Sequence, residues 1–474
     1  ETATETMIFH SIVWRLLREP CLHPFAEFHR LCRYYSILHI FLEYFPKKIL
    51  MKNCAWKESR NLCIIGKEYK EEKTMDILKN ENIKNAAAVL WHKFLLAETV
   101  NDIILSEIKD RLYLQNVDED WLMSPETSPR DTFMARITDL AFGDVVEEAV
   151  ASLYENKEVL LPCSDLTEAK DPGRLYDLMM ETVMEQLTCQ DGSTVKKNPY
   201  YEQIHISPDK ENCIALATAD YLPYEFFQTF PRYKKENPFL YGEAGFFKER
   251  MTFPVILENN RVWMSVVPSE IRSMEKDIEA AKGKVITYGL GLGYYAFMAS
   301  EKEEVESVTV VEMNRDVISL FKRNILPQFP NKEKIRIIEA DAFAFIEKQE
   351  DGGYDTAFSD FWSGVDDGLD LYLRFMAKTA RFAKTKHSYW IETCFMEYFF
   401  RPVLIRVLME QITGKKIIMP EVSGRIRKVQ NRFETYLKTK NDRITSPEEL
   451  TLLFTNESMI SLMRDFAIKD PMRP

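Results

Sequence analysis

The sequence predicts an α/β protein that combines a doubly wound, mainly parallel sheet with a helical N-terminal domain and a small antiparallel β element. Three observations predict this class. Residues 269–440 alternate strand-like runs with helical segments, the rhythm of a parallel sheet. Residues 75–195 repeat apolar side chains every three or four positions, which is typical of amphipathic helices. Residues 196–268 alternate apolar and polar side chains, as half-buried strands do.

The composition indicates a globular chain that is long enough for several domains. Of its 474 residues 46% are hydrophobic, and the formal net charge is -12. This negative net charge disfavours extensive binding of nucleic acid phosphates, so we expect no nucleic acid partner. The eight cysteines show neither C-x-x-C nor zinc-type spacing, which predicts reduced thiols, a cytoplasmic location and no metal site. The most apolar early stretch, residues 36–45, is about half as long as a membrane-spanning helix, so we expect no membrane partner.

Residues 1–74 differ in composition from the rest of the chain. They hold four of the seven His and four of the eight Cys, but no Asp. They end in KEYKEEKT just before Met75, and a purine-rich ribosome-binding site would give such a run if it were translated. Two interpretations stay open: an extension that precedes the native start, or a native helical segment.

The regions on either side of the predicted sheet contain recognisable turns and caps. Asn259 and Asn260 separate two strand-like runs and predict a hairpin turn. Residues 221–247 are dense in aromatic side chains and Pro, and such a loop is expected to pack on a neighbouring domain or a ligand. Residues 441–474 are expected to be a helical C-terminal segment, with Ser446 as a helix cap before Pro447.

Six strand-like runs in residues 269–440 predict the strands of the sheet. They are KVITYG, SVTVVEM, KIRIIEAD, YDTAFSD, HSYWIETCF and KKIIMP. In such a Rossmann-like sheet, ligands bind at the carboxyl ends of the strands. The first five ends carry, in order, the glycines Gly289, Gly291 and Gly293, then Glu312, Asp341, Asp360 and Glu392. After the sixth run, RIRKVQNRFETYLKTK is expected to form a basic loop and the last strand.

The turn GLGLG, residues 289–293, is expected to hold a polar or anionic ligand, because glycines allow positive φ and a close approach to unpaired N–H groups. Glu312, about twenty residues further on, is placed to accept both hydroxyls of a ribose. Asp341 is placed to accept a hydrogen bond from an adenine amino group, beside the apolar Ala342. Each signal alone has a simpler interpretation, a tight turn or a helix cap. Two ligands compete, a dinucleotide and S-adenosylmethionine.

The spacing of the glycines favours S-adenosylmethionine. A dinucleotide fingerprint, G-x-G-x-x-A, fits Gly291, Gly293 and Ala296 and would share Glu312. Counted from the first glycine after the strand, however, its third position falls on Tyr294, a bulky ring where helix and strand must pack closely. With its Gly-x-Gly-x-Gly turn and with acids that end the next three strands, the stretch 269–440 resembles the class I S-adenosylmethionine-dependent methyltransferases. Within that superfamily, SVTVVEMN, IRIIEADAFAFI and YDTAFSDFW most resemble the spermidine-synthase-like branch.

The resemblance implies a role for each strand-end residue. By it, the three glycines would line the methionine part of the cofactor, Glu312 the ribose, and Asp341 the adenine. Asp360 would lie at the edge of the reaction site. Two positions depart from the pattern: Thr287 stands where an acid commonly precedes the glycines, and Ser363 follows where the polyamine synthases have a second Asp. Transfer of an aminopropyl group is therefore less strongly predicted than the fold.

The segment DFWSGVDDGLDLYLRF is expected to contact the acceptor. Asp366 and Asp367 lie close in sequence to Trp362, and carboxylates beside an aromatic face are suited to a cationic amine. The alternative is that both acids only cap the helix that follows. Asp360 or Glu392 would accept the proton of the amine. The alternative for Glu392 is a hydrogen-bonded polar residue within its strand.

Together these patterns predict an S-adenosylmethionine-dependent methyltransferase that acts on a small molecule, an amine in our interpretation. The alternatives are an aminopropyltransferase that uses decarboxylated S-adenosylmethionine, an NAD(P)-dependent oxidoreductase, and a cofactor-binding regulatory protein without catalysis. The expected partner is a small, cationic substrate. Assembly into a homo-oligomer is compatible with the sequence.

Overall fold

The structure is a computed structural model. It describes residues 64–65, 76–110, 114, 119–124, 132–155, 172–230, 238–239, 242–362, 365–414, 416–417, 422, 424–440 and 443–469. Apart from Ile64–Ile65, the segment 1–74 for which the sequence left two interpretations open lies outside these ranges. The domain boundaries expected from the sequence stay predictions.

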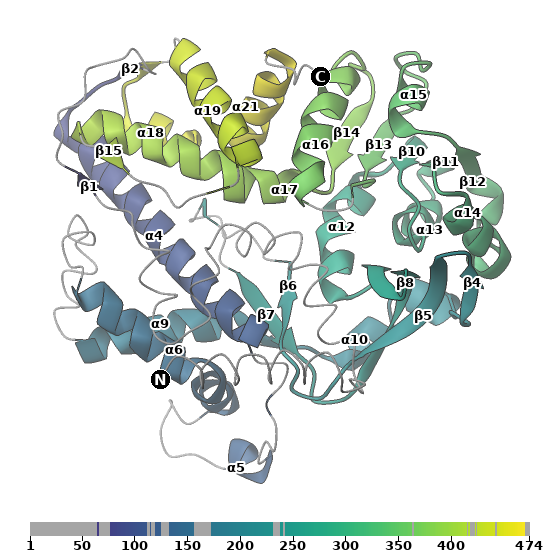
Figure 1. The fold of residues 1–474 in the computed structure, drawn as a ribbon, viewed down its shortest axis with the longest axis horizontal. Helices are drawn as coiled ribbons and strands as arrows, with labels where there is room; N and C mark the ends of the chain where they lie inside the picture. The colour runs from purple at the N-terminus through teal and green to yellow at the C-terminus, as the bar shows by residue number, and fades with distance from the viewer. Residues whose placement is uncertain are drawn as a thin grey trace, which may run out of the picture.

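Five parallel strands form the central sheet (Figure 1). They are β10 (Gly283–Tyr288), β11 (Val305–Glu312), β12 (Ile335–Glu339), β13 (Thr356–Ser359) and β14 (Lys386–Tyr389). Their order is β12-β11-β10-β13-β14, so the direction of winding reverses between β10 and β13. This is a Rossmann-like α/β sheet, which confirms the predicted fold class. Ligands of such sheets bind where the winding reverses, at the carboxyl ends of the strands.

Helices cover both faces of the sheet (Figure 1). Those that connect its strands or precede it are α12 (Pro268–Ala280), α13 (Tyr294–Ser300), α14 (Arg315–Leu320), α15 (Ala342–Ile346) and α16 (Val365–Thr379), with the short turns η1 (Phe321–Ile325), η2 (Leu326–Gln328) and η3 (Lys332–Lys334) after α14. Because side chains alternate along a strand, Val285 joins the core on one face while Ile286 joins the core on the other.

The sixth predicted strand and the predicted end of the fifth are wrong. The described residues of KKIIMP form β15 (Lys416–Ile417), which pairs antiparallel with β1 (Ile64–Ile65) outside the parallel sheet. The chain leaves the sheet after β14 through α17 (Glu392–Phe395), η4 (Met396–Phe400) and α18 (Arg401–Thr413), whose buried faces carry it away from the sheet edge. Glu392 therefore begins a helix instead of ending a strand.

The basic segment that follows is a helix, α19 (Gly424–Thr439), and neither a loop nor a strand. The reason is the spacing of its apolar residues, which recur every three or four positions and form one buried stripe. The stripe consists of Ile426, Val429, Phe433, Tyr436 and Leu437. The charged residues between them hid this periodicity in the sequence.

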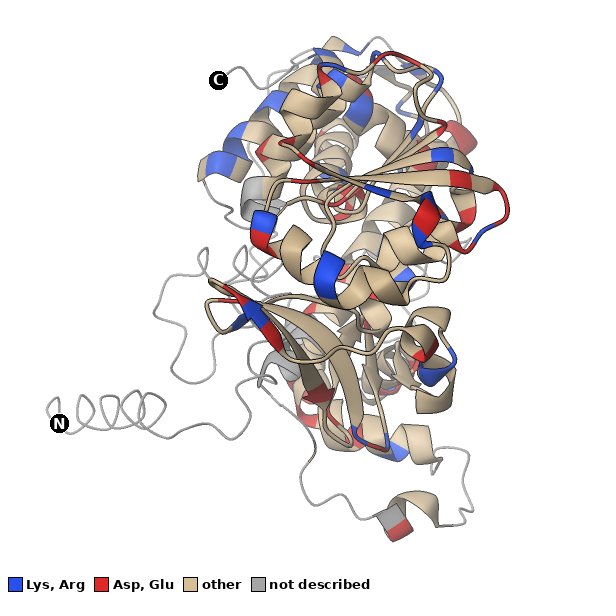
Figure 2. Ribbon diagram, turned by 90° about the vertical axis from the view of Figure 1, so that its right-hand side faces the viewer, with Lys and Arg blue, Asp and Glu red and all other residues tan. Residues whose placement is uncertain are grey.

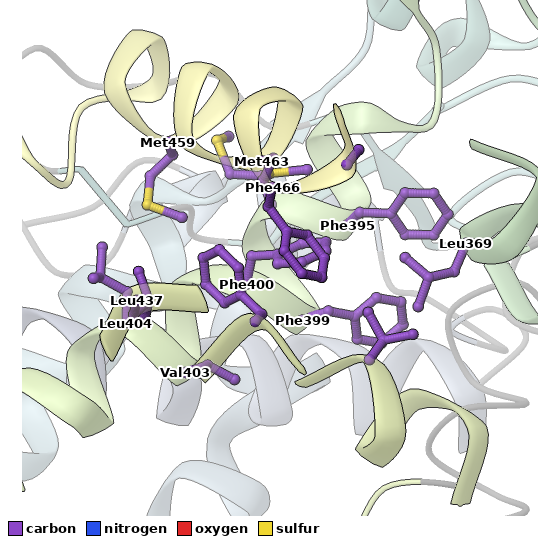
Figure 3. Close-up of a cluster of buried hydrophobic side chains, with 14 of the residues drawn as sticks. Leu369, Phe395, Phe399, Phe400, Val403, Leu404, Leu437, Met459, Met463 and Phe466 are labelled. Carbon is purple, nitrogen blue, oxygen red and sulfur yellow. The ribbon is translucent and has the colours of Figure 1, made fainter. Parts of the chain in front are cut away.

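The C-terminal helices complete the largest core. They are α20 (Pro447–Leu452) and α21 (Asn456–Lys469), and α20 begins at the predicted cap, where Ser446 accepts a hydrogen bond from the Glu449 amide at 3.2 Å. Figure 3 shows part of this core, where Phe466 of α21 lies with Phe399 and Phe400 of η4 among aliphatic and Met side chains. Short β16 (Arg443–Ile444) pairs with β2 (Asp76–Ile77).

The N-terminal part of the described chain is helical, as expected. Its helices are α4 (Glu81–Asp110), α5 (Glu119–Met123), α6 (Phe133–Glu155) and α9 (Pro172–Glu185), and the last three pack around a core of their own that includes part of α4. Two further short helices, α10 (Gly192–Lys196) and α11 (Pro199–Gln203), lead from this region to the β element. In the part of the chain that is described, no helix combines the length and apolarity needed to cross a membrane.

The predicted antiparallel element is present as a four-stranded sheet. Its order is β4-β5-β8-β9, formed by β4 (Asp209–Glu211), β5 (Ile214–Tyr221), β8 (Met251–Glu258) and β9 (Arg261–Ser265). Asn259 and Asn260 take φ values of 52° and 62° between β8 and β9, which confirms the predicted hairpin turn. A second small sheet joins β3 (Leu187–Cys189), β7 (Glu243–Phe246) and β6 (Phe227–Thr229). Acidic and basic residues are mixed along the described helices and strands (Figure 2).

Candidate functional site

The glycine turn follows β10 where the winding of the sheet reverses. Gly289, Gly291 and Gly293 all have positive φ, at 101°, 52° and 76°. A Cβ on Gly289 would lie 1.9 Å from the carbonyl oxygen of Asp360, and one on Gly293 would lie 2.3 Å from the Phe321 ring. Both the backbone conformation and the close packing therefore require glycine here.

Hydrogen bonds inside the turn decide which of its N–H groups are available. The Gly289 amide donates to the Val311 carbonyl at 2.9 Å, and the Gly293 amide donates to the Leu290 carbonyl at 2.8 Å. Among the described residues, the amides of Gly291 and Leu292 make no hydrogen bond. Successive free amides in a turn of positive φ form a concave donor surface that suits a carboxylate or another polar group.

Glu312 ends β11 beside this turn and is only 8% exposed. One carboxylate oxygen accepts a hydrogen bond from the Leu290 amide at 3.0 Å, and the other accepts one from the Asn314 amide at 2.7 Å. Burial raises the pKa of Glu312, although these amides oppose the shift. The Met313 amide is a further backbone donor to this carboxylate, and because a carboxylate has about four acceptor positions, Glu312 can support the turn and still accept a hydrogen bond from a ribose.

Asp341 lies at the carboxyl end of the neighbouring strand and is exposed. Its Oδ1 accepts a hydrogen bond from the Ala344 amide at 2.8 Å, so it caps α15, whose first residue Ala342 is buried. The capping interpretation of the sequence is therefore realised. The contact to adenine stays a prediction, and it is compatible with the cap because a carboxylate has four acceptor positions.

Two apolar residues that directly follow strand-end acids were not singled out from the sequence as site residues. Met313 directly follows Glu312 and is 70% exposed, although most Met side chains prefer burial. Phe361 directly follows Asp360, and its ring centroid lies 6.1 Å from that of Phe343 in α15. An apolar residue next to each strand-end acid was the signal that could have identified them, because an adenine needs apolar surface beside its polar edge.

Asp360 follows β13 and lies against the glycine turn. Its amide donates to the Tyr288 carbonyl at 2.8 Å, and its own carbonyl fills the space that a side chain on Gly289 would need. The side chain is partly buried. The structure thus brings Asp360 and the turn together at the sheet edge, as the strand pattern predicted.

Trp362 is more deeply buried than expected of an open binding face. It is 6% exposed, and its ring centroid lies 4.4 Å from that of Phe361 and 6.3 Å from that of Tyr372. In the described part of the chain its indole N–H has no hydrogen-bond partner. Asp366 and Asp367 lie in the first turn of α16, and their side chains lie outside the described residues. Their contact with an acceptor stays a prediction.

Glu392 is held by groups from two distant helices. Its carboxylate accepts hydrogen bonds from the Tyr372 hydroxyl at 2.6 Å and from Nε and Nη2 of Arg464 at 2.9 and 2.8 Å. It is 5% exposed. Because Arg464 engages both of its carboxylate oxygens, this geometry favours a role for Glu392 as an anchor between α17 and α21. Its catalytic assignment stays an untested prediction.

Comparisons with known proteins identify no family for this chain. No family model matches the chain, and no curated protein does. Among solved structures, the chain is similar to a proposed O-methyltransferase from Klebsiella pneumoniae, at 12% identity and a TM-score of 0.22 over 28% of this chain and 60% of that one. It is also similar to the spermidine synthase from Thermotoga maritima, at 12% identity and a TM-score of 0.24 over 38% of this chain and 70% of that one. Scores this low carry no argument about function.

Proposed function

We propose that this chain is an S-adenosylmethionine-dependent transferase that moves a methyl group to a small molecule, an amine in our interpretation. One observation carries the proposal: a turn of three glycines with positive φ lies beside a buried carboxylate, Glu312, where the winding of the sheet reverses. The proposal includes a cytoplasmic location and a cationic substrate. It includes neither a nucleic acid nor a membrane as partner.

The residues at the sheet edge suit the parts of this cofactor. The free amides of Gly291 and Leu292 are donors for its carboxylate. Glu312 has acceptor capacity for a ribose hydroxyl. Asp341 and the exposed Met313 offer a polar and an apolar contact to the adenine. Free amides after β10, the Glu312 carboxylate with Met313 after β11, and the Asp341 carboxylate after β12 thus follow one another along this edge of the sheet.

Methyl transfer requires little from the protein beyond alignment of the acceptor with the methyl group. S-adenosylmethionine, when bound, supplies a methyl group that its sulfonium has activated. Asp360 would orient an incoming amine and take up the proton that the amine loses as the new carbon–nitrogen bond forms and the carbon–sulfur bond breaks. Asp360 is the better candidate for this role than Glu392, because Asp360 lies against the glycine turn whereas Glu392 begins α17 and is anchored to Arg464 and Tyr372.

The alternatives predict different ligands. Aminopropyl transfer would require decarboxylated S-adenosylmethionine, and the segment after Asp360 lacks the second acid of the polyamine synthases. An oxidoreductase would require NAD(P), and Tyr294 disfavours it: this ring is 6% exposed and packs 5.4 Å from Tyr200, where a dinucleotide fingerprint needs a small residue. A regulatory protein would bind the cofactor without turnover.

Calorimetric titration distinguishes these functions. The chain is titrated with S-adenosylmethionine, its decarboxylated form, S-adenosylhomocysteine and NAD, and then incubated with S-adenosylmethionine and a panel of small amines. We expect the first ligand and S-adenosylhomocysteine to bind, and S-adenosylhomocysteine to form with at least one amine. Binding of NAD alone, or of none of the four, would contradict the proposal. Binding without turnover would favour the regulatory alternative.

A further inference from the structure

A buried tyrosine that is far from the glycine turn in sequence donates a hydrogen bond to the backbone of the turn. Tyr200, in α11, is 0% exposed, and its hydroxyl donates a hydrogen bond to the Leu292 carbonyl at 2.7 Å across 92 positions of sequence. Its ring packs edge-on against Tyr294 and Phe297, with both centroid distances at 5.4 Å. Burial raises the pKa of Tyr200, so the hydroxyl keeps its proton and remains a donor.

The neighbour of Tyr200 adds a second contact on the same side. The Asn198 side-chain amide donates to the Tyr294 hydroxyl at 3.0 Å, next to the last glycine of the turn. Asn198 also caps α11 by accepting a hydrogen bond from the Tyr200 amide at 3.0 Å. The segment that leads into the β element is therefore fastened to the turn at both Leu292 and Tyr294.

These contacts fix a peptide unit that glycine leaves free to rotate. The carbonyl of Leu292 and the N–H of Gly293 belong to one trans peptide and point in opposite directions. Tyr200 holds the carbonyl, and the Leu290 carbonyl holds the N–H at 2.8 Å. The Leu290 carbonyl and the Gly291 N–H also belong to one trans peptide, so the bond that fixes this carbonyl fixes the direction of the Gly291 N–H as well. The hydroxyl of Tyr200 thus helps to set the direction of a free donor.

We infer that Tyr200 is a positioning residue, which sets the orientation of the glycine-turn peptides for the cofactor. This inference rests on the proposed function and deepens it, since it adds the Tyr200 hydroxyl to the groups that shape the cofactor site. Without the hydroxyl, the turn would still form but would sample other peptide orientations, because its glycines resist such rotation less than other residues. The cofactor would then select one orientation from several, which lowers its apparent affinity.

The test removes one oxygen and keeps the ring. Tyr200→Phe is compared with Tyr201→Phe, because the Tyr201 hydroxyl also donates to a backbone carbonyl, that of Val266, which lies outside the turn. We expect Tyr200→Phe to raise the Kd for S-adenosylmethionine about tenfold, the equivalent of about 1.4 kcal/mol, and Tyr201→Phe to leave it within about twofold. Thermal melting checks that both variants fold.

Hydrogen exchange provides a readout that needs no ligand. The peptide that covers residues 289–297 is followed by mass spectrometry in the wild type and both variants. We expect faster exchange in this peptide for Tyr200→Phe only. Equal exchange in all three proteins, or equal weakening of binding by both variants, would overturn the inference. If the wild type binds no adenosyl ligand while exchange still responds, the proposed function fails and the support of the turn by Tyr200 stands.

Discussion

Replacing Glu312 with glutamine removes a negative charge from the carboxyl end of β11 and leaves the side-chain volume almost unchanged. In the wild type the two carboxylate oxygens accept hydrogen bonds from the Leu290 and Asn314 amides. Glutamine has only one oxygen, so its NH2 group faces one of these amides and leaves it without an acceptor. A buried donor without an acceptor costs about 1–3 kcal/mol, and we expect Glu312→Gln to lower the free energy of unfolding by that amount.

The same change tests the cofactor contact. Hydrogen bonds to a charged acceptor contribute about 1.5–3 kcal/mol, so losing the charge should weaken binding of S-adenosylmethionine by about 2 kcal/mol, about 30-fold in Kd. Calorimetry measures the Kd and thermal melting measures the stability. Glu339→Gln is the matched control: this acid ends the next strand but pairs with Arg315 on the surface, where ion pairs contribute about 0–1 kcal/mol. A folded Glu312→Gln variant with wild-type affinity would refute the assignment.

Three further predictions concern the turn, the reaction and the pH dependence of stability. Gly293→Ala should lower the free energy of unfolding by about 2–4 kcal/mol, because it combines positive φ with a clash against the buried Phe321 ring. Gly414→Ala is the control: it has positive φ but nothing within 4 Å of the new Cβ, so thermal melting should show a loss of only about 1 kcal/mol. Asp360→Asn should keep cofactor affinity within a few fold while turnover falls by about 10²-fold or more; loss of both together would show that Asp360 is structural. Burial lowers the pKa of His387 to about 4, so the folded state binds fewer protons than the unfolded state, and stability should fall by about 3 kcal/mol as the pH drops from about 6.5 to 4. His387→Leu should remove this slope in pH-dependent denaturation, and an unchanged slope would contradict the cause.

The parallel strands could be predicted because their signals are local. An apolar run followed by an acid or a glycine at residues 288–293, 312, 341 and 360 indicates a buried strand and its carboxyl end without knowledge of any partner. The turn at Asn259 and Asn260 is equally local, since only a few residue types accept positive φ in succession.

The errors and omissions concern contacts between distant segments. The salt bridge of Glu392 depends on Arg464, 72 positions later, and the support of Leu292 depends on Tyr200, 92 positions earlier. The stripe on α19 was hidden among charges, and KKIIMP looked like a sheet strand although α18 carries it away from the sheet. A run of apolar residues predicts that a segment is buried, but it does not predict which other segment it packs against.

The most direct test of the proposed site is a crystal structure of the chain with S-adenosylhomocysteine. We predict that the nucleoside lies along the carboxyl ends of β10, β11 and β12, with both ribose hydroxyls within hydrogen-bonding distance of Glu312 and the amino-acid end on the amides of Gly291 and Leu292. A nucleoside bound elsewhere, or bound at this edge without contact to Glu312, would contradict the account.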